Sequence, residues 1–102
     1  MSDFRDVCCD LMKENYFEYF VKLCHDNGLQ CYVEPYGFGP FNGLEVGGVC
    51  DIPMGEFWMN RPVSIVRSSV SSAHIYGKNV VSAESFTSQA PINWKGHPAM
   101  AK

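Results

Sequence analysis

The sequence lacks the features that mark several large classes of protein. No apolar run approaches the roughly 20 residues that a membrane-spanning helix needs, and the polar amino terminus does not resemble a signal peptide. The net charge of −3 gives no electrostatic reason to expect binding to nucleic acid or to an anionic membrane surface. The sequence therefore predicts neither nucleic acid nor a membrane as a partner.

The five cysteines do not form a metal or redox motif. Their number is odd and no CxxC spacing occurs, so we expect neither a zinc site nor a disulfide framework. We expect them to be buried, reduced thiols that pack as small hydrophobic groups. The chain also lacks a Gly-x-Ser-x-Gly elbow and the glycines of a phosphate loop, which argues against a serine hydrolase and against nucleotide binding.

The composition is that of a folded protein. Hydrophobic residues make up 46% of the chain and aromatic residues 14%, which is enough for a packed core. With 102 residues, the chain forms one domain at most, or a piece of a larger one.

Helix and strand patterns alternate along the chain. Residues 4–26 place apolar side chains at three- and four-residue steps, which predicts an amphipathic helix that stops at Asn27 and Gly28. We expect buried strands at 29–34, 49–54 and 80–83, and a helix at 62–75 that begins near Pro62. The glycine-rich residues 36–50 and the segment 85–95 are expected to be loops. This order predicts an α/β fold with about three parallel strands and flanking helices.

Three glutamates, Glu34, Glu56 and Glu84, follow strand-like runs and lie beside aromatic residues. Because the carboxyl ends of parallel strands meet at one edge of a sheet, we expect these side chains at the edge where active sites form. Glycoside hydrolysis uses two carboxyl groups, one to protonate the leaving oxygen and one to activate water or attack the sugar. A third carboxylate suits a hard cation such as calcium. The alternative interpretation is that each is an ordinary solvated loop residue.

Several other side chains are candidates for binding a sugar. The aromatic ones are expected either to stack on sugar rings or to anchor the core and loops; they are Tyr36, Phe38, Phe41, Trp58 and Trp94. His74 and His97 are each either structural or functional. Asp51 opens a predicted strand, where a structural hydrogen-bonding role competes with contact to calcium.

Segments spread over nearly the whole chain resemble glycoside hydrolase family 106, the α-L-rhamnosidases and their large bacterial relatives. The most distinctive segment is DIPMGEFW at 51–58. The others are ENYF at 14–17, HDNGL at 25–29, EPYG at 34–37, GPF at 39–41, AHIYGK at 73–78 and AESFT at 83–87.

The resemblance implies a TIM (β/α)₈ barrel and calcium-assisted, inverting hydrolysis of terminal α-L-rhamnosides. It implies that Glu84 is a catalytic carboxylate, the general base, and that Glu56 is a second catalytic or calcium-binding carboxylate. Glu34 would contact the sugar or calcium, and the substrate-binding residues would also include Tyr36, Trp58 and His74.

Relatives in this family are far longer, and a domain does not normally end one turn into a helix such as the one that residues 97–102 begin. We therefore expect residues 1–102 to be a single fragment of a catalytic barrel, inactive alone, whose partner is the remainder of the parent domain. The parent is expected to be bacterial and periplasmic or secreted. Two alternatives remain open. One is a small non-catalytic α/β module that binds a sugar or a protein partner, and the other is a retaining glycosidase.

Overall fold

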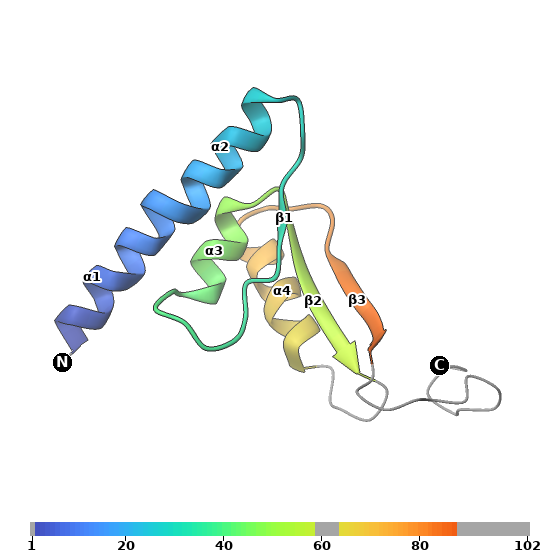
Figure 1. Cartoon of the computed structure of the whole chain (residues 1–102). Coiled ribbons are helices and arrows are strands. Elements are labelled where there is room, and N and C mark those ends of the chain that lie inside the picture. Colours follow the sequence, from blue (N-terminus) through green and yellow to red (C-terminus); the bar gives the residue numbers. More distant parts are fainter. Residues whose placement is uncertain (1, 59–63, 88–102) are drawn as a thin grey trace, which may run out of the picture.

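The computed structural model describes residues 2–58 and 64–87, which form an α/β unit. Its elements are α1 (Ser2–Met12), the π-helical turn η1 (Lys13–Glu18), α2 (Tyr19–Asp26), β1 (Tyr32–Val33), α3 (Gly43–Val49), β2 (Ile52–Trp58), α4 (Ser64–Ile75) and β3 (Ser82–Thr87) (Figure 1). The predictions that concern Pro62, Trp94, His97, the loop after residue 87 and the helix at 97–102 lie outside the described residues.

Elements α1, η1 and α2 together form one long helix, which confirms the prediction for residues 4–26. The π-helical turn at its centre was not expected from the sequence. The helix ends as predicted, because Gly28 adopts a φ of 71°, which a residue without a side chain reaches without strain. The Leu29 N–H then donates to the Cys24 carbonyl at 2.9 Å and the Gly28 N–H to the His25 carbonyl at 3.0 Å, which satisfies the last helical carbonyls.

The apolar face of this long helix is only partly covered by the described residues. Val21 is buried against Cys31 and Cys50, the centre of the small core. Towards the amino terminus, by contrast, Phe4 is 78% exposed and Leu11 is 54% exposed. The described residues therefore leave much of the apolar face of α1 exposed.

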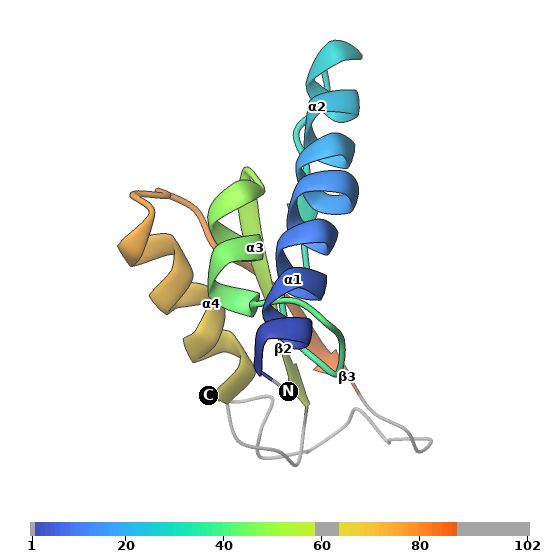
Figure 2. The same ribbon diagram turned by 90° about the vertical axis from the view of Figure 1, so that its left-hand side faces the viewer.

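The sheet has three parallel strands in the order β1-β2-β3, as the alternation of elements predicts. Helix α4 packs on β2 and α3 packs on α4, while the long helix lies beside α3 (Figure 2). Figures 1 and 2 show the helices on one side of the sheet, and no described element covers the other side. No described helix has the length and apolar character needed to cross a membrane.

The strand bounds differ from the predicted ones. Strand β1 contains only Tyr32–Val33, whereas β2 and β3 begin later than expected and run to Trp58 and Thr87. As a result, Glu56 and Glu84 lie within strands and not after them. The sequence pattern does not predict that β2 and β3 extend through these residues, because glutamate has little strand preference. Where each strand ends is decided by its pairing with the neighbouring strand.

The glycine-rich segment was wrongly expected to be a loop throughout, since α3 occupies its second half. The Asn42 side chain caps this helix by accepting a hydrogen bond from the Leu44 N–H at 3.1 Å. A Cβ atom on Gly47 would lie 2.3 Å from the Ser72 Oγ. Glycine is therefore required here by close packing between two helices, which outweighs its poor helix preference.

Small side chains also line the buried face of α4. Ser69, Ser72 and Ala73 are buried, and the Ser72 hydroxyl donates to the Leu44 carbonyl at 2.8 Å. Val70 is 44% exposed, so the larger valine side chain does not lie on this buried face. On the sheet side, a Cβ on Gly55 would lie 2.8 Å from the Val66 Cα, which shows how closely α4 approaches β2.

We predict that Gly47→Ala destabilises the protein. Alanine gains up to about 1 kcal/mol of helix preference, but the added methyl group meets Ser72 in a closed site, where overpacking costs about 1–3 kcal/mol. Thermal unfolding followed by circular dichroism should therefore give a lower melting temperature. The matched control is Gly48→Ala, whose methyl group meets the ring of Tyr76; this side chain is 45% exposed, so it has space on the solvent side into which to shift. Equal stability of the two variants would contradict this account of the α3–α4 contact.

Candidate active site

Two of the predicted carboxylates are brought side by side by the pairing of β2 with β3. Glu56 and Glu84 are register partners in these parallel strands. Gly55 faces α4, so the next residue, Glu56, points to the opposite face of the sheet, which no described element covers. Glu84 shares that face because side chains of register partners point the same way, across neighbouring strands about 4.8 Å apart.

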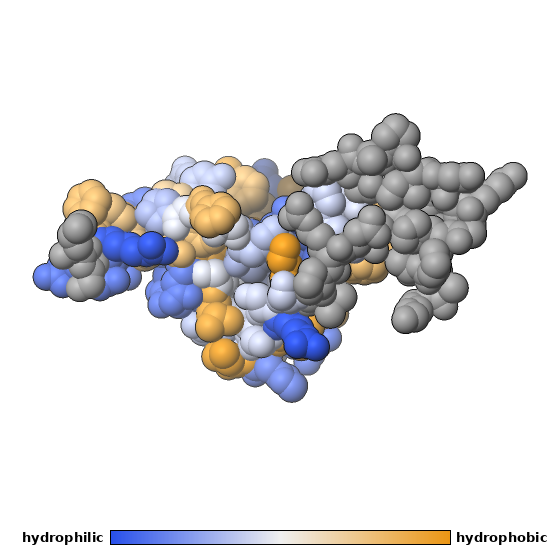
Figure 3. Space-filling view, turned by 90° about the horizontal axis from the view of Figure 1, so that it is seen from below, coloured by the Kyte–Doolittle hydropathy of each residue, from blue (hydrophilic) through white to orange (hydrophobic). Residues whose placement is uncertain are grey.

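Both carboxylates also lie near the carboxyl ends of their strands. Glu56 precedes the last residue of β2, Trp58, by two positions, and Glu84 precedes the last residue of β3, Thr87, by three. Figure 3 views the molecule from this end, and hydrophobic and hydrophilic side chains both reach the surface there. Parallel α/β sheets build their active sites at this edge, as the sequence analysis expects.

Tyr36 connects β1 to the carboxylate on β2. Its hydroxyl donates a hydrogen bond to the Glu56 Oε2 at 2.8 Å, and its backbone N–H bonds to the Glu34 carbonyl at 2.9 Å in a tight turn after β1. Burial, the hydrogen bond to Glu56 and the nearby charge of Glu34 all raise the pKa of the Tyr36 phenol. The phenol therefore stays protonated and acts as a donor. Glu34 itself is exposed, directly after β1.

Thr87 is a partner of Glu84 that the sequence analysis missed. Its hydroxyl donates to the Glu84 Oε1 at 2.7 Å. In a regular strand, residues three apart point to opposite faces, so side-chain alternation alone gives no reason to pair them. The sequence alone contains no signal for this pair, because it depends on how β3 pairs with β2.

The other predicted contacts separate into two groups. Trp58 is half-buried at the end of β2, where it is the register partner of Thr87, so the structure brings it to the same edge as the carboxylates. Phe41 instead packs against Phe17 of the long helix at 5.6 Å between ring centroids, and Phe38 is fully exposed.

His74 is not brought to the carboxylates. It is exposed in the last turn of α4, a helix that begins after β2 ends and leads back to the start of β3. That turn therefore belongs to the opposite edge of the parallel sheet. The predicted contact of His74 with substrate gains no support from this arrangement.

The described residues do not by themselves fit a calcium site. No three side chains of His, Cys, Asp or Glu converge as metal ligands in residues 2–58 and 64–87. Calcium takes six to eight oxygen ligands, whereas Glu34 and Glu56 offer two carboxylates, one of which already accepts a hydrogen bond from Tyr36. The described residues therefore assign calcium no part in the reaction.

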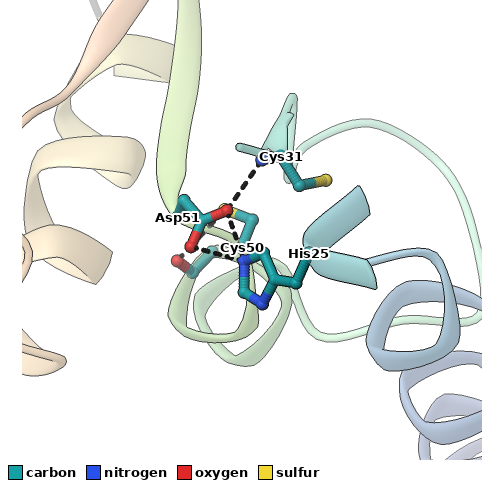
Figure 4. A network of polar contacts seen from close by, with 5 residues as sticks. His25, Cys31, Cys50 and Asp51 are labelled. Atoms are coloured by element: carbon teal, nitrogen blue, oxygen red, sulfur yellow. Dashed lines mark hydrogen bonds and ion pairs between the residues drawn. The ribbon is translucent and has the colours of Figure 1, made fainter. Parts of the chain in front are cut away.

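A second polar cluster surrounds Asp51, where β2 begins (Figure 4). The Cys31 backbone N–H donates to the Asp51 Oδ2 at 2.7 Å, and the His25 Nε2 lies 2.9 and 3.0 Å from the two carboxylate oxygens. The hydrogen bond from Cys31 and the contact with His25 hold the pKa of Asp51 below its usual value of 3.8. The cluster connects α2, β1 and β2. This is the structural hydrogen-bonding role that the sequence suggests for Asp51 as the alternative to contact with calcium.

The thiols near Asp51 are poor candidates for a nucleophile. Cys31 is buried, and burial together with the neighbouring Cys24 raises the pKa of its thiol to about 11. Burial also raises the pKa of Cys50. A thiol is reactive only as the thiolate, so these groups are inert near neutral pH. The five cysteines are free thiols in the structure.

A cavity of about 570 Å³ lies elsewhere, where α1 meets the segment that leads into α3. It is lined by Arg5, Asp6, Cys9, Asp10, Phe41, Asn42, Gly43 and Glu45. None of the three candidate carboxylates lines it. Size alone does not make it the active site, and the chemistry of the chain points to the open face of the sheet.

The sequence is similar to those of known proteins. The profile of glycoside hydrolase family 106, described as alpha-L-rhamnosidase, matches residues 1–102. A protein of Formosa agariphila named "Putative beta-glucuronidase" is 47% identical over 102 residues. This match covers 98% of the present chain but 8% of that protein, so the chain spans a small part of its length. No solved structure matches the chain.

We predict that Asp51→Asn destabilises the protein at neutral pH by about 1–3 kcal/mol, the contribution of hydrogen bonds to a charged group. Because the folded-state pKa of Asp51 is lowered, its contribution is present above pH 3.8 and is lost as the pH falls through the folded-state value. Urea unfolding at pH 7 and at pH 3 should therefore show a difference between wild type and variant that narrows in acid.

The control is Asp26→Asn, which breaks an exposed pair with Lys22 on the same helix turn. Solvent screens such pairs, so its effect should be much smaller. If both substitutions lower stability equally at pH 7, the Asp51 cluster does not have the structural role described above.

Proposed function

The chain belongs to glycoside hydrolase family 106, and from this premise we propose that it supplies the paired carboxylates of a sugar-cleaving site within a longer glycosidase. The observation that supports the proposal most is the alignment of Glu56 with Glu84 on the uncovered face of the sheet. Most glycosidases cleave the glycosidic bond with two carboxyl groups that lie near each other, and this face of the sheet carries such a pair at the active-site edge.

The two carboxylates take different roles in the proposal. Glu84 is the general base that removes a proton from the attacking water, since it is exposed and open to solvent. Glu56 is half-buried and held by the Tyr36 hydroxyl, which suits the second carboxylate that faces the sugar. Glu34 and Trp58 lie at the same edge and contact the substrate.

An inverting mechanism fits the way the two carboxylates are held. Inverting enzymes separate their carboxyl groups by about 6.5–9.5 Å, against about 5–5.5 Å in retaining enzymes, to leave room for water. Tyr36 follows β1, on one side of β2, whereas Thr87 lies in β3, on the other side. Tyr36 holds Glu56 from the side of β1, and Thr87 holds Glu84 over its own strand, β3. Neither hydrogen bond draws the two carboxylates together, which fits the wider separation.

The proposed substrate is a terminal α-L-rhamnoside. Rhamnose is a neutral deoxysugar, whereas a glucuronide carries a carboxylate that three neighbouring glutamates would repel. Among the described residues, Glu34, Glu56 and Glu84 form no ion pair with lysine or arginine. The charge of the site thus favours the substrate in the family description over the one in the name of the Formosa relative.

The longer protein is proposed to close the sheet into a barrel. Parallel strands with helices on one side are the arrangement of a slice through a (β/α)₈ barrel, whose interior face would be the one left uncovered here. The exposed apolar side chains of α1, such as Phe4 and Leu11, would also be buried by other parts of the longer protein. Calcium at the sugar hydroxyls remains a prediction, and its remaining ligands would come from other parts of the protein.

We predict that Glu84→Gln in the longer protein lowers kcat for an aryl α-L-rhamnoside by about 10²–10⁴-fold, the usual contribution of general acid–base catalysis. Glu56→Gln should reduce kcat to a similar extent. The matched control is Glu45→Gln, which removes the charge of a surface pair with Lys13 but keeps an oxygen that can accept the hydrogen bond from the Asn42 side chain, and which should leave turnover unchanged. Wild-type turnover in the Glu84 variant would remove this residue from the mechanism. The product anomer, read by proton NMR at early times, should be inverted.

We also predict that the purified 102-residue chain does not hydrolyse the same rhamnoside. Three strands leave the active-site face uncovered, so water is not excluded and the sugar is held from one side only. Hydrolysis by the chain alone that Glu84→Gln abolishes would show that no further strands are needed. An aryl β-D-glucuronide tested in parallel with the longer protein separates the two substrate classes.

A further inference from the structure

Between its last two register pairs with β2, strand β3 contains one extra residue. Phe57 of β2 aligns with Ser85, but the next residue, Trp58, aligns with Thr87. Phe86 therefore has no partner on β2 and forms a bulge. Its φ of 63° lies in the left-handed region, which a bulky residue without special support rarely adopts.

The bulge changes the direction in which Thr87 points. In an uninterrupted strand, residues 84 and 87 would face opposite sides of the sheet. The extra residue shifts the alternation by one, and Thr87 returns to the face that carries Glu84. The hydrogen bond of 2.7 Å from the Thr87 Oγ1 to the Glu84 Oε1 shows that the two side chains meet there.

Phe86 is held in its unusual conformation by an aromatic contact. Its ring packs edge-to-face against Phe57, with 5.0 Å between the ring centroids. Phe57 follows Glu56 in β2, so it points to the other face of the sheet, towards the helices. The bulge thus places an aromatic anchor on one face and a hydroxyl donor on the other. Backbone strain of this kind is concentrated at functional sites.

We propose that Thr87 is a positioning residue for Glu84, and that the bulge at Phe86 exists to deliver its hydroxyl. The hydroxyl fixes one carboxylate oxygen, Oε1, and so restricts Glu84 to one rotamer with Oε2 left to meet the attacking water. Glu84 is exposed, and an exposed glutamate without such a partner samples several rotamers. This role rests on the proposed function of Glu84 as the general base.

The first test measures the rotamer of Glu84 in the 102-residue chain and needs no activity. Three-bond NMR couplings about χ1 should report a single rotamer in the wild type and averaging in Thr87→Val, which keeps the shape of threonine but lacks the hydroxyl. Thr87→Ser restores the hydroxyl and should restore the single rotamer. A single rotamer that survives in Thr87→Val would overturn the proposal.

The matched control is Ser85→Ala in the same strand. The Ser85 hydroxyl bonds to the Ala83 carbonyl at 3.1 Å, and Ser85 alternates with Glu84 to the other face. Its removal should leave the couplings of Glu84 unchanged. Averaging in Ser85→Ala as well would show that any lost hydroxyl loosens β3, which would contradict a specific role for Thr87.

The second test measures turnover in the longer protein. Thr87→Val should lower kcat for the aryl α-L-rhamnoside by about 10- to 100-fold, as expected when a catalytic group is misplaced by about 1 Å. The KM should stay within about twofold because binding groups are untouched, and Thr87→Ser should recover most of kcat.

The outcomes separate the two claims. If Glu84→Gln retains wild-type turnover, the proposed function of Glu84 fails. If Glu84→Gln is inactive while Thr87→Val turns over like the wild type, only the positioning role of Thr87 fails.

Discussion

The parallel pairing of β2 with β3 is the constraint on which the functional features depend. It places Glu56 opposite Glu84 and directs both to the face of the sheet away from the helices. Each carboxylate then meets a hydroxyl group from a different direction, Tyr36 after β1 and Thr87 beyond the bulge of β3. Since side chains alternate along a strand, a shift of one position would move Glu84 to the helix-covered face and dismantle the site.

The polar groups of the chain divide between the two ends of the sheet. At the end where β2 begins, Asp51 joins His25 and the backbone of Cys31 in contacts that fix how the long helix meets the first two strands. At the other end, Glu56 and Glu84 each accept a hydrogen bond from a hydroxyl group through one carboxylate oxygen. This division follows the general behaviour of parallel α/β folds, in which one edge stabilises the structure and the other carries the chemistry.

Much of the fold could be predicted from local patterns. The spacing of apolar residues and the positions of glycine and proline predict the long helix, its stop at Gly28 and the parallel order of the strands. The three candidate glutamates follow from their places after strand-like runs. Helix α3 could not be predicted, because its glycines are explained by contacts with distant segments, such as the approach of Ser72 to Gly47. The partnership of Thr87 with Glu84 was also hidden, since it depends on a bulge that arises only when two strands are paired. The local sequence indicates which residues prefer a helix or a strand. The register between strands and the close approach of one helix to another are set only when the chain is folded.

The register of β2 and β3 is the central claim, and NMR measures it directly. In the isotope-labelled chain, nuclear Overhauser effects between backbone protons across the two strands should connect the residues around Glu56 with those around Glu84. They should also show the displaced alignment after Phe57 that the extra residue Phe86 creates. Contacts that instead align Glu84 with Gly55 or with Phe57 would place it on the opposite face from Glu56 and would contradict the paired-carboxylate site.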